Sequence, residues 1–286
     1  MKRTIKLVLL IALGLIGPMR VDAFTGTNGM GDNGMGDNGM GDNGMGDNGM
    51  GDNGLGDAGF NDVRFLDWIS GRDVDSTLGD IATSTERAHT FKYVYGCAAG
   101  RDDYRSVTIQ LPPTPDNPSG LVTYKFHGNY GLLPSWVQGQ PLTFRGKEIL
   151  LACLAAHVNP EGQTVPISFR GWKESGDSVD MYDGEQSAYS VRSACFLAYQ
   201  DNDSIFVAGA GGYDYGVLPF GEGSESRTCV NVYGGIGLRC PHVPEIGICN
   251  DYCEVVGGTG PGTGVFANCV VNGTPAVAYT VYLMPQ

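Results

Sequence analysis

The chain has 286 residues, of which 42% are hydrophobic and 17% are charged. Glycine occupies 45 positions, roughly twice its usual share in proteins, and 31 acidic residues against 18 basic ones give a net charge of −13. This charge argues against a nucleic-acid-binding protein, which usually presents a basic face to phosphate groups. A collagen is also excluded, because glycine does not stand at every third position.

The first 23 residues have the features of a secretory signal peptide. Lys2, Arg3 and Lys6 form a basic start, and an apolar run from Leu7 to Ile16 follows it. Spanning a bilayer takes about 20 apolar residues, so this run is too short, and an uncleaved anchor is the weaker alternative. We expect cleavage after Ala23, where small residues match a signal-peptidase site. The mature chain then keeps 14 basic and 30 acidic residues, a net charge of −16.

Residues 24–60 consist mainly of a repeat, with seven consecutive pentapeptides over 26–60. The commonest unit is Gly-Asp-Asn-Gly-Met. Two glycines per unit raise the entropic cost of any fixed conformation, and one methionine offers little apolar surface to offset that cost. We therefore expect a disordered spacer. A solenoid that turns at its Asn-Gly pairs is one alternative. Metal binding is the other, because carboxylates suit calcium and methionine thioethers suit Cu(I).

From Asn61 the repeat stops and aromatic and β-branched residues appear. We expect residues 61–88 to form a lead-in arm and residues 89–286 to form one β-rich domain with disulfides. Strands are predicted where runs rich in Val, Tyr, Phe and Thr are bounded by Gly, Pro, Asn or Asp. In chain order these runs are His89–Tyr95, Ser106–Leu111, Leu121–Phe126, Thr164–Phe169, Ile205–Ala208, Val265–Val271 and Ala276–Leu283.

One run breaks this pattern. Residues 146–159 are rich in Leu and Ala, which favour helices, and apolar residues lie nearly all around the helix they would form. We predict a buried helix that ends at Asn159-Pro160. The expected fold class is therefore α+β and β-rich, with an antiparallel sheet or sandwich body, one buried helix and stapling disulfides, preceded by the repeat.

The eight cysteines support export to an oxidising compartment. An even number of cysteines in an exported chain is most simply explained by four disulfides. We expect Cys97 to pair with Cys153, which would join the buried helix to the first strand. The other pairings stay open, and the full set is Cys97, Cys153, Cys195, Cys229, Cys240, Cys249, Cys253 and Cys269.

Two cysteine chemistries compete weakly with disulfides. Cys153 and His157 are four residues apart on one helix face, which suits a nucleophile and its base, but an even count leaves no spare thiol. Cys240, His242, Cys249 and Cys253 loosely match a zinc site.

Acidic and aromatic clusters are the remaining candidate sites. Asp177, Asp180, Asp183 and Glu185 form a weak candidate calcium site, set against the simpler reading of a solvated turn. Otherwise we expect no cofactor. The glycine-rich segment 208–221 carries a second candidate, because exposed aromatic rings can stack on a sugar or a partner protein. Its aromatic residues are Tyr213, Tyr215 and Phe220.

Four segments carry a resemblance to a known family. They are Tyr93–Ala98, Gly131–Trp136, Ala152–Asn159 and Ile167–Gly171. In this order they resemble an uncharacterised family of exported proteins common in myxobacteria, and the resemblance covers roughly residues 93–269. It implies export, an Asn-Gly-rich repeat and a Cys-rich C-terminal domain, but no activity. The chain departs from the family at residues 185–191, where members tend to show a Gly-Ala-Phe-type motif.

These features favour a secreted, periplasmic or cell-surface protein with a binding or structural role rather than a catalytic one. The spacer would display the domain for adhesion, matrix contact or glycan binding. The partner would be an extracellular polymer or a surface protein, with no nucleic acid and no membrane span after cleavage. One alternative is a secreted hydrolase of an extracellular polymer, although no carboxylate pair is singled out. The second alternative is metal binding by the repeat.

Overall fold

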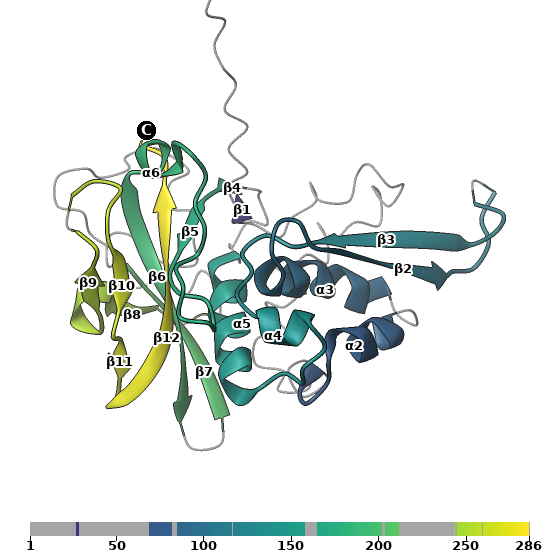
Figure 1. Cartoon of the computed structure of the whole chain (residues 1–286), viewed down its shortest axis with the longest axis horizontal. Coiled ribbons are helices and arrows are strands. Elements are labelled where there is room, and N and C mark those ends of the chain that lie inside the picture. Colours follow the sequence, from purple (N-terminus) through teal and green to yellow (C-terminus); the bar gives the residue numbers. More distant parts are fainter. Residues whose placement is uncertain are drawn as a thin grey trace, which may run out of the picture.

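The computed structural model describes residues 27–28, 69–81, 85–115, 117–157, 165–201, 204–211, 243, 245–258 and 260–285. Helix α5 lies between a curved sheet on one side and the helices α2, α3 and α4 on the other (Figure 1). The β-rich α+β fold with an antiparallel core sheet, a buried helix and disulfides is therefore confirmed for these residues.

The main sheet has the strand order β11-β12-β6-β7-β8. Its long strands are β6 (Val191–Asp201), β7 (Ser204–Gly211) and β12 (Thr274–Leu283), which pair antiparallel. Strand β8 (Glu245–Ile248) joins β7 in parallel. Strands β5 (Ser168–Arg170) and β11 (Val270–Val271) pair with different parts of β12. The strands predicted near β7, β11 and β12 are thus confirmed.

Strand β6 lies at the centre of the sheet and was missed from the sequence. Phe196 and Ala198 belong to the core shared with α5, whereas Cys195 and Leu197 belong to a second cluster on the opposite face. Because both faces are buried, the strand shows no alternation of polar and apolar residues, and alternation is the main sequence mark of a strand.

Helix α5 (Phe144–His157) confirms the predicted buried helix. Thr143 caps it, since its Oγ1 accepts a hydrogen bond of 2.9 Å from the backbone amide of Gly146. The helix packs against β6, β7 and β12 and also against α3. This position between two layers explains why its apolar residues run nearly all around it.

The predicted strand at His89–Tyr95 is wrong, because these residues lie inside helix α3 (Thr85–Ala98). Aromatic and β-branched residues favour strands only weakly, and packing overrides that preference. Phe91, Val94, Tyr95 and Ala98 are fully buried, and their spacing of three, one and three residues forms one face of a helix.

Three shorter elements surround α3. Helix α2 (Val74–Ile81) begins after Asp73, whose carboxylate accepts a hydrogen bond from the Ser76 amide. Strands β2 (Tyr104–Gln110) and β3 (Leu121–His127) form a hairpin that extends beyond the helices in Figure 1. Both strands were predicted from the sequence. Helix α4 (Pro134–Val137) follows the hairpin.

The Cys-rich C-terminal part covers the other face of the sheet. It contains the short helix η4 (Cys249–Asp251) and the antiparallel pair β9 (Glu254–Val256) and β10 (Val265–Ala267). Helix α6 (Glu185–Ala188) lies just before β6 in the chain. Disulfides Cys195–Cys249 and Cys253–Cys269 tie this part to β6 and to itself.

Two residues of the first pentapeptide join the body. Strand β1 (Thr27–Asn28) pairs antiparallel with β4 (Val165–Pro166). The rest of the repeat and the signal segment lie outside the described residues, so the spacer stays a prediction. Within the described ranges, no helix is both long and apolar enough to cross a membrane.

Candidate functional site

A cleft of about 540 Å³ opens where α3 ends and the β2–β3 hairpin begins. Its walls come from three segments that are distant in sequence: residues 98–105, which run from the end of α3 to the start of β2, the region around α4, and the loop after β5. The polar residues of its lining are Asp103, Arg105, Gln138, Lys173, Ser175 and Asp177.

The floor of the cleft is formed by the C-terminal end of α3 and by the segment 129–133 that caps it. The last carbonyls of a helix lack partners inside the helix. Here the amide of Gly131 donates to Ala99 at 2.9 Å, and the amides of Leu132 and Leu133 donate to the carbonyls of Cys97 and Ala98. These bonds fix Ala98, Ala99 and Gly131 along the floor.

The loop after β5 forms one wall, and the Arg101 side chain contacts it. The Arg101 guanidinium lies 3.3 Å from the Tyr182 ring centroid and donates a hydrogen bond of 2.7 Å to the Asp180 carbonyl. Lys173 of the same loop forms an ion pair of 2.7 Å with the Asp180 carboxylate. The wall therefore has a defined position relative to the turn between α3 and β2.

The chemistry of the cleft is polar and mixed in sign. Asp103 and Asp177 supply carboxylate oxygens, whereas Arg105 and Lys173 supply cationic donors. Gln138 adds an amide with both a donor and an acceptor. Such a lining suits a neutral ligand with many hydrogen-bonding groups better than a strongly charged or apolar ligand.

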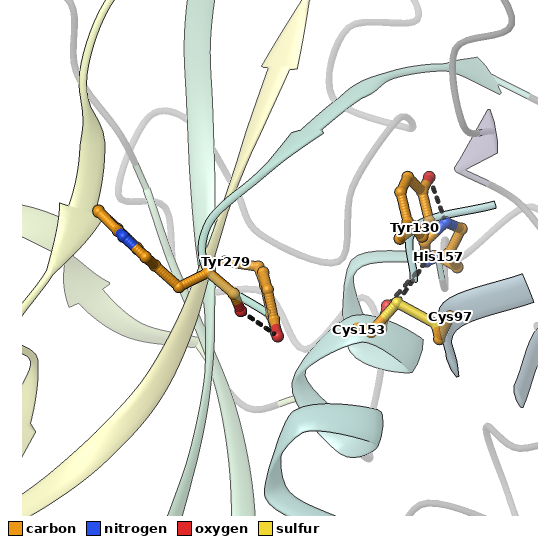
Figure 2. Close-up of a disulfide and its surroundings, with 6 residues drawn as sticks. Cys97, Tyr130, Cys153, His157 and Tyr279 are labelled. Atoms are coloured by element: carbon orange, nitrogen blue, oxygen red, sulfur yellow. Dashed lines mark hydrogen bonds between the residues drawn. A yellow bond between two sulfur atoms is a disulfide. The ribbon is translucent and has the colours of Figure 1, made fainter. Parts of the chain in front are cut away.

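A buried polar cluster lies beside the Cys97–Cys153 disulfide (Figure 2). His157, at the end of α5, has Nδ1 2.7 Å from the Cys153 carbonyl oxygen and Nε2 3.0 Å from the Tyr130 hydroxyl. Because the carbonyl can only accept, Nδ1 carries the proton and Nε2 accepts from Tyr130. Burial lowers the pKa of His157 to about 4, and it raises the pKa of Tyr130. The imidazole is therefore neutral near pH 7.

The cysteines form the predicted kind of bond where they are described. Cys97 pairs with Cys153, as expected, with the Cα atoms 6.2 Å apart. This bond joins α3 to α5, and the expected link from helix to strand is wrong because Cys97 lies in a helix. Cys249 and Cys253 are both in disulfides, so the loose zinc match is also wrong. Cys229 and Cys240 lie outside the described residues.

The four residues of the candidate calcium site have separate surroundings. Asp180 pairs with Lys173, and Asp177 accepts a hydrogen bond of 2.8 Å from Ser175. The Glu185 carboxylate accepts from the Tyr182 amide at 2.9 Å. Asp183 and these three do not form a group of three or more converging ligand atoms in the described structure. Calcium binding by them stays a prediction.

Two other predicted sites cannot be placed. Tyr213, Tyr215 and Phe220 lie outside the described residues, as do the acidic residues of the repeat. The cleft residues Asp103, Arg105, Gln138 and Lys173 were not predicted. No local motif marks them, because they converge only through the folding of three separate segments.

No protein-family model, no curated protein and no solved structure matches the chain. The resemblance to an exported myxobacterial family therefore stays a prediction.

Proposed function

We propose that this protein is an exported, non-enzymatic binding protein. It binds a segment of an extracellular polymer, such as a glycan, in the cleft beside Gln138. The observation that carries the proposal is the lining of that cleft. It combines carboxylates, cations and an amide, which together can donate to and accept from several hydroxyl groups. The three disulfides within the described residues fit a domain that works outside the cytoplasm.

The test is a glycan and polymer array probed with the mature protein and two variants. Gln138→Ala removes an amide from the cleft, and we expect it to weaken binding about tenfold. Gln140→Ala is the matched control, because Gln140 is an exposed residue two positions away and outside the lining. Equal binding by both variants, or no bound polymer at all, would contradict the assignment of the cleft.

One observation favours the hydrolase alternative enough to test it in parallel. Asp103 and Asp177 place two carboxylates in one cleft, and glycoside hydrolases use a pair of carboxylates as acid and base or nucleophile. Any polymer that binds should be incubated with wild type, Asp103→Asn, Asp177→Asn and the control Asp102→Asn. Turnover that both cleft variants abolish and the control keeps would replace the binding function with a catalytic one.

A further inference from the structure

We propose that the buried cluster of Cys97, Cys153 and His157 binds one thiophilic metal ion, Zn(II) or Cu(I), when its disulfide is reduced. Two thiolates and an imidazole are a ligand set that both ions accept. This site is separate from the cleft, and the proposal does not depend on the function proposed above.

The donor atoms are already gathered. One ligand atom from each of the three residues lies within 4.8 Å of the other two, and all three residues are buried. The His157 Nδ1 is 3.9 Å from the Cys153 sulfur. A zinc ion with ordinary bond lengths to sulfur and nitrogen holds these two atoms roughly 3.5 Å apart. The required adjustment between helix positions 153 and 157 is therefore small.

The rigid frame keeps the ligands in place. Cys153 and His157 are four positions apart on one face of α5. This helix is capped and is packed on both sides. Cys97 lies in α3, whose last carbonyls are capped by segment 129–133. Once the sulfur–sulfur bond opens, the two sulfurs need to separate to about 3.8 Å to share one ion.

The chemistry balances without other groups from the protein. A trialkylphosphine supplies two electrons and water supplies two protons, so that the disulfide becomes two thiols and the phosphine becomes its oxide. Metal binding displaces the two thiol protons into solvent. The neutral imidazole moves its proton from Nδ1 to Nε2, which then donates to the Tyr130 oxygen instead of accepting from it.

The experiment titrates the phosphine-reduced mature chain with Zn(II) in one arm and Cu(I) in the other, each against a competing chelator. All eight cysteines are then thiols and could bind metal. Removal of the His157 imidazole is therefore the change that reports on the proposed site alone. We expect His157→Gln to weaken the tightest site at least about tenfold. The matched control His127→Gln, which changes an exposed imidazole on β3, should leave it unchanged. The double variant Cys97→Ala/Cys153→Ala should bind one ion fewer.

Circular dichroism covers the case in which reduction unfolds the chain. Metal added to the reduced wild type should then restore the near-ultraviolet spectrum, and it should fail to do so for His157→Gln. Equal affinity for wild type and both histidine variants, or an unchanged number of ions in the double cysteine variant, would overturn the proposal. Absence of both binding and recovered structure would overturn it as well.

Discussion

At the scale of single residues, His157 couples the stability of the fold to pH. Its folded-state pKa of about 4 lies below the ordinary value of 6.5, because burial penalises the charged imidazole. Between these two values the unfolded chain binds one proton more than the folded chain. His157 therefore does not lower the free energy of unfolding above about pH 6.5, and it lowers that free energy progressively as the pH falls toward 4.

We expect His157 to contribute at most about 3 kcal/mol to this loss, because folding lowers its pKa from 6.5 to about 4. Urea unfolding of wild type and His157→Gln between pH 4 and 7 measures it. The wild type should lose more stability than the variant across this range, and His127→Gln should follow the wild type. Parallel pH curves for wild type and His157→Gln would contradict the prediction.

Arg170 is a buried cation that joins three segments. Its guanidinium donates to the Ser168 hydroxyl, the Gly262 carbonyl and the Tyr189 carbonyl at 2.6–2.9 Å, and it lies 3.8 Å from the Tyr282 ring centroid. A lysine has no planar fork and cannot replace these bonds together.

We therefore expect Arg170→Lys to lower the free energy of unfolding by about 2–4 kcal/mol. Arg105→Lys is the control, because Arg105 is partly exposed and its carboxylate partner Asp75 is 3.9 Å away. This control should change stability by less than about 0.5 kcal/mol. Denaturant midpoints decide the matter, and similar losses in both variants would show that the three bonds at Arg170 carry no special weight.

At the scale of elements, the end of α3 depends on a close approach by Gly128. A Cβ atom at this position would overlap the carbonyl oxygen of Gly100 and the backbone of Ala99. The segment 129–133, which caps α3 and contributes to the cleft floor, follows directly, so a side chain at position 128 would push this segment away from the end of α3.

We expect Gly128→Ala to lower the free energy of unfolding by about 1–3 kcal/mol and to weaken the binding of any ligand in the cleft. Gly79→Ala is the opposite case, since Gly79 lies in α2 with no atom within 4 Å of the added Cβ. It should raise stability by about 0.5–1 kcal/mol. Thermal unfolding of both variants provides the comparison. A neutral Gly128→Ala would mean that the capping segment moves freely.

At the scale of the whole molecule, the three described disulfides account for six of the eight cysteines. If all eight are oxidised, as we predict for an exported chain, only Cys229 and Cys240 remain to pair with each other. Peptide mapping without reduction should find this pair, and thiol titration of the denatured, unreduced protein should find no free thiol. Single Cys229→Ala should expose one thiol. A free thiol in the wild type would contradict the assignment.

The repeat should contribute little to the stability of the body. Only Thr27 and Asn28 pair with it among the described residues, so removal of residues 24–60 should lower the melting temperature by less than about 4 °C. The double variant Thr27→Pro/Asn28→Pro, which removes two backbone donors, should reproduce whatever shift occurs. A larger drop on truncation that the proline variant lacks would show that other repeats dock.

The sequence by itself determined the elements whose evidence is local. The buried helix, strands β2 and β3, and strands β7, β11 and β12 of the main sheet follow from composition and periodicity over short windows. The pairing of Cys97 with Cys153 was also predicted, although from a wrong assignment of Cys97 to a strand. The apolar 3-1-3 spacing in α3 was available in the sequence, but aromatic and β-branched residues pointed to a strand.

Only the tertiary structure decided the features that depend on distant contacts. Strand β6 was hidden because two layers bury it from both faces and remove its alternation. No sequence pattern marks Arg170 as buried, because the carbonyls that surround it belong to residues distant in sequence. The cleft residues come from three separate segments, and no local pattern encodes their convergence. Local propensity contributes little free energy per residue, whereas the packing of whole elements fixes which side chains meet.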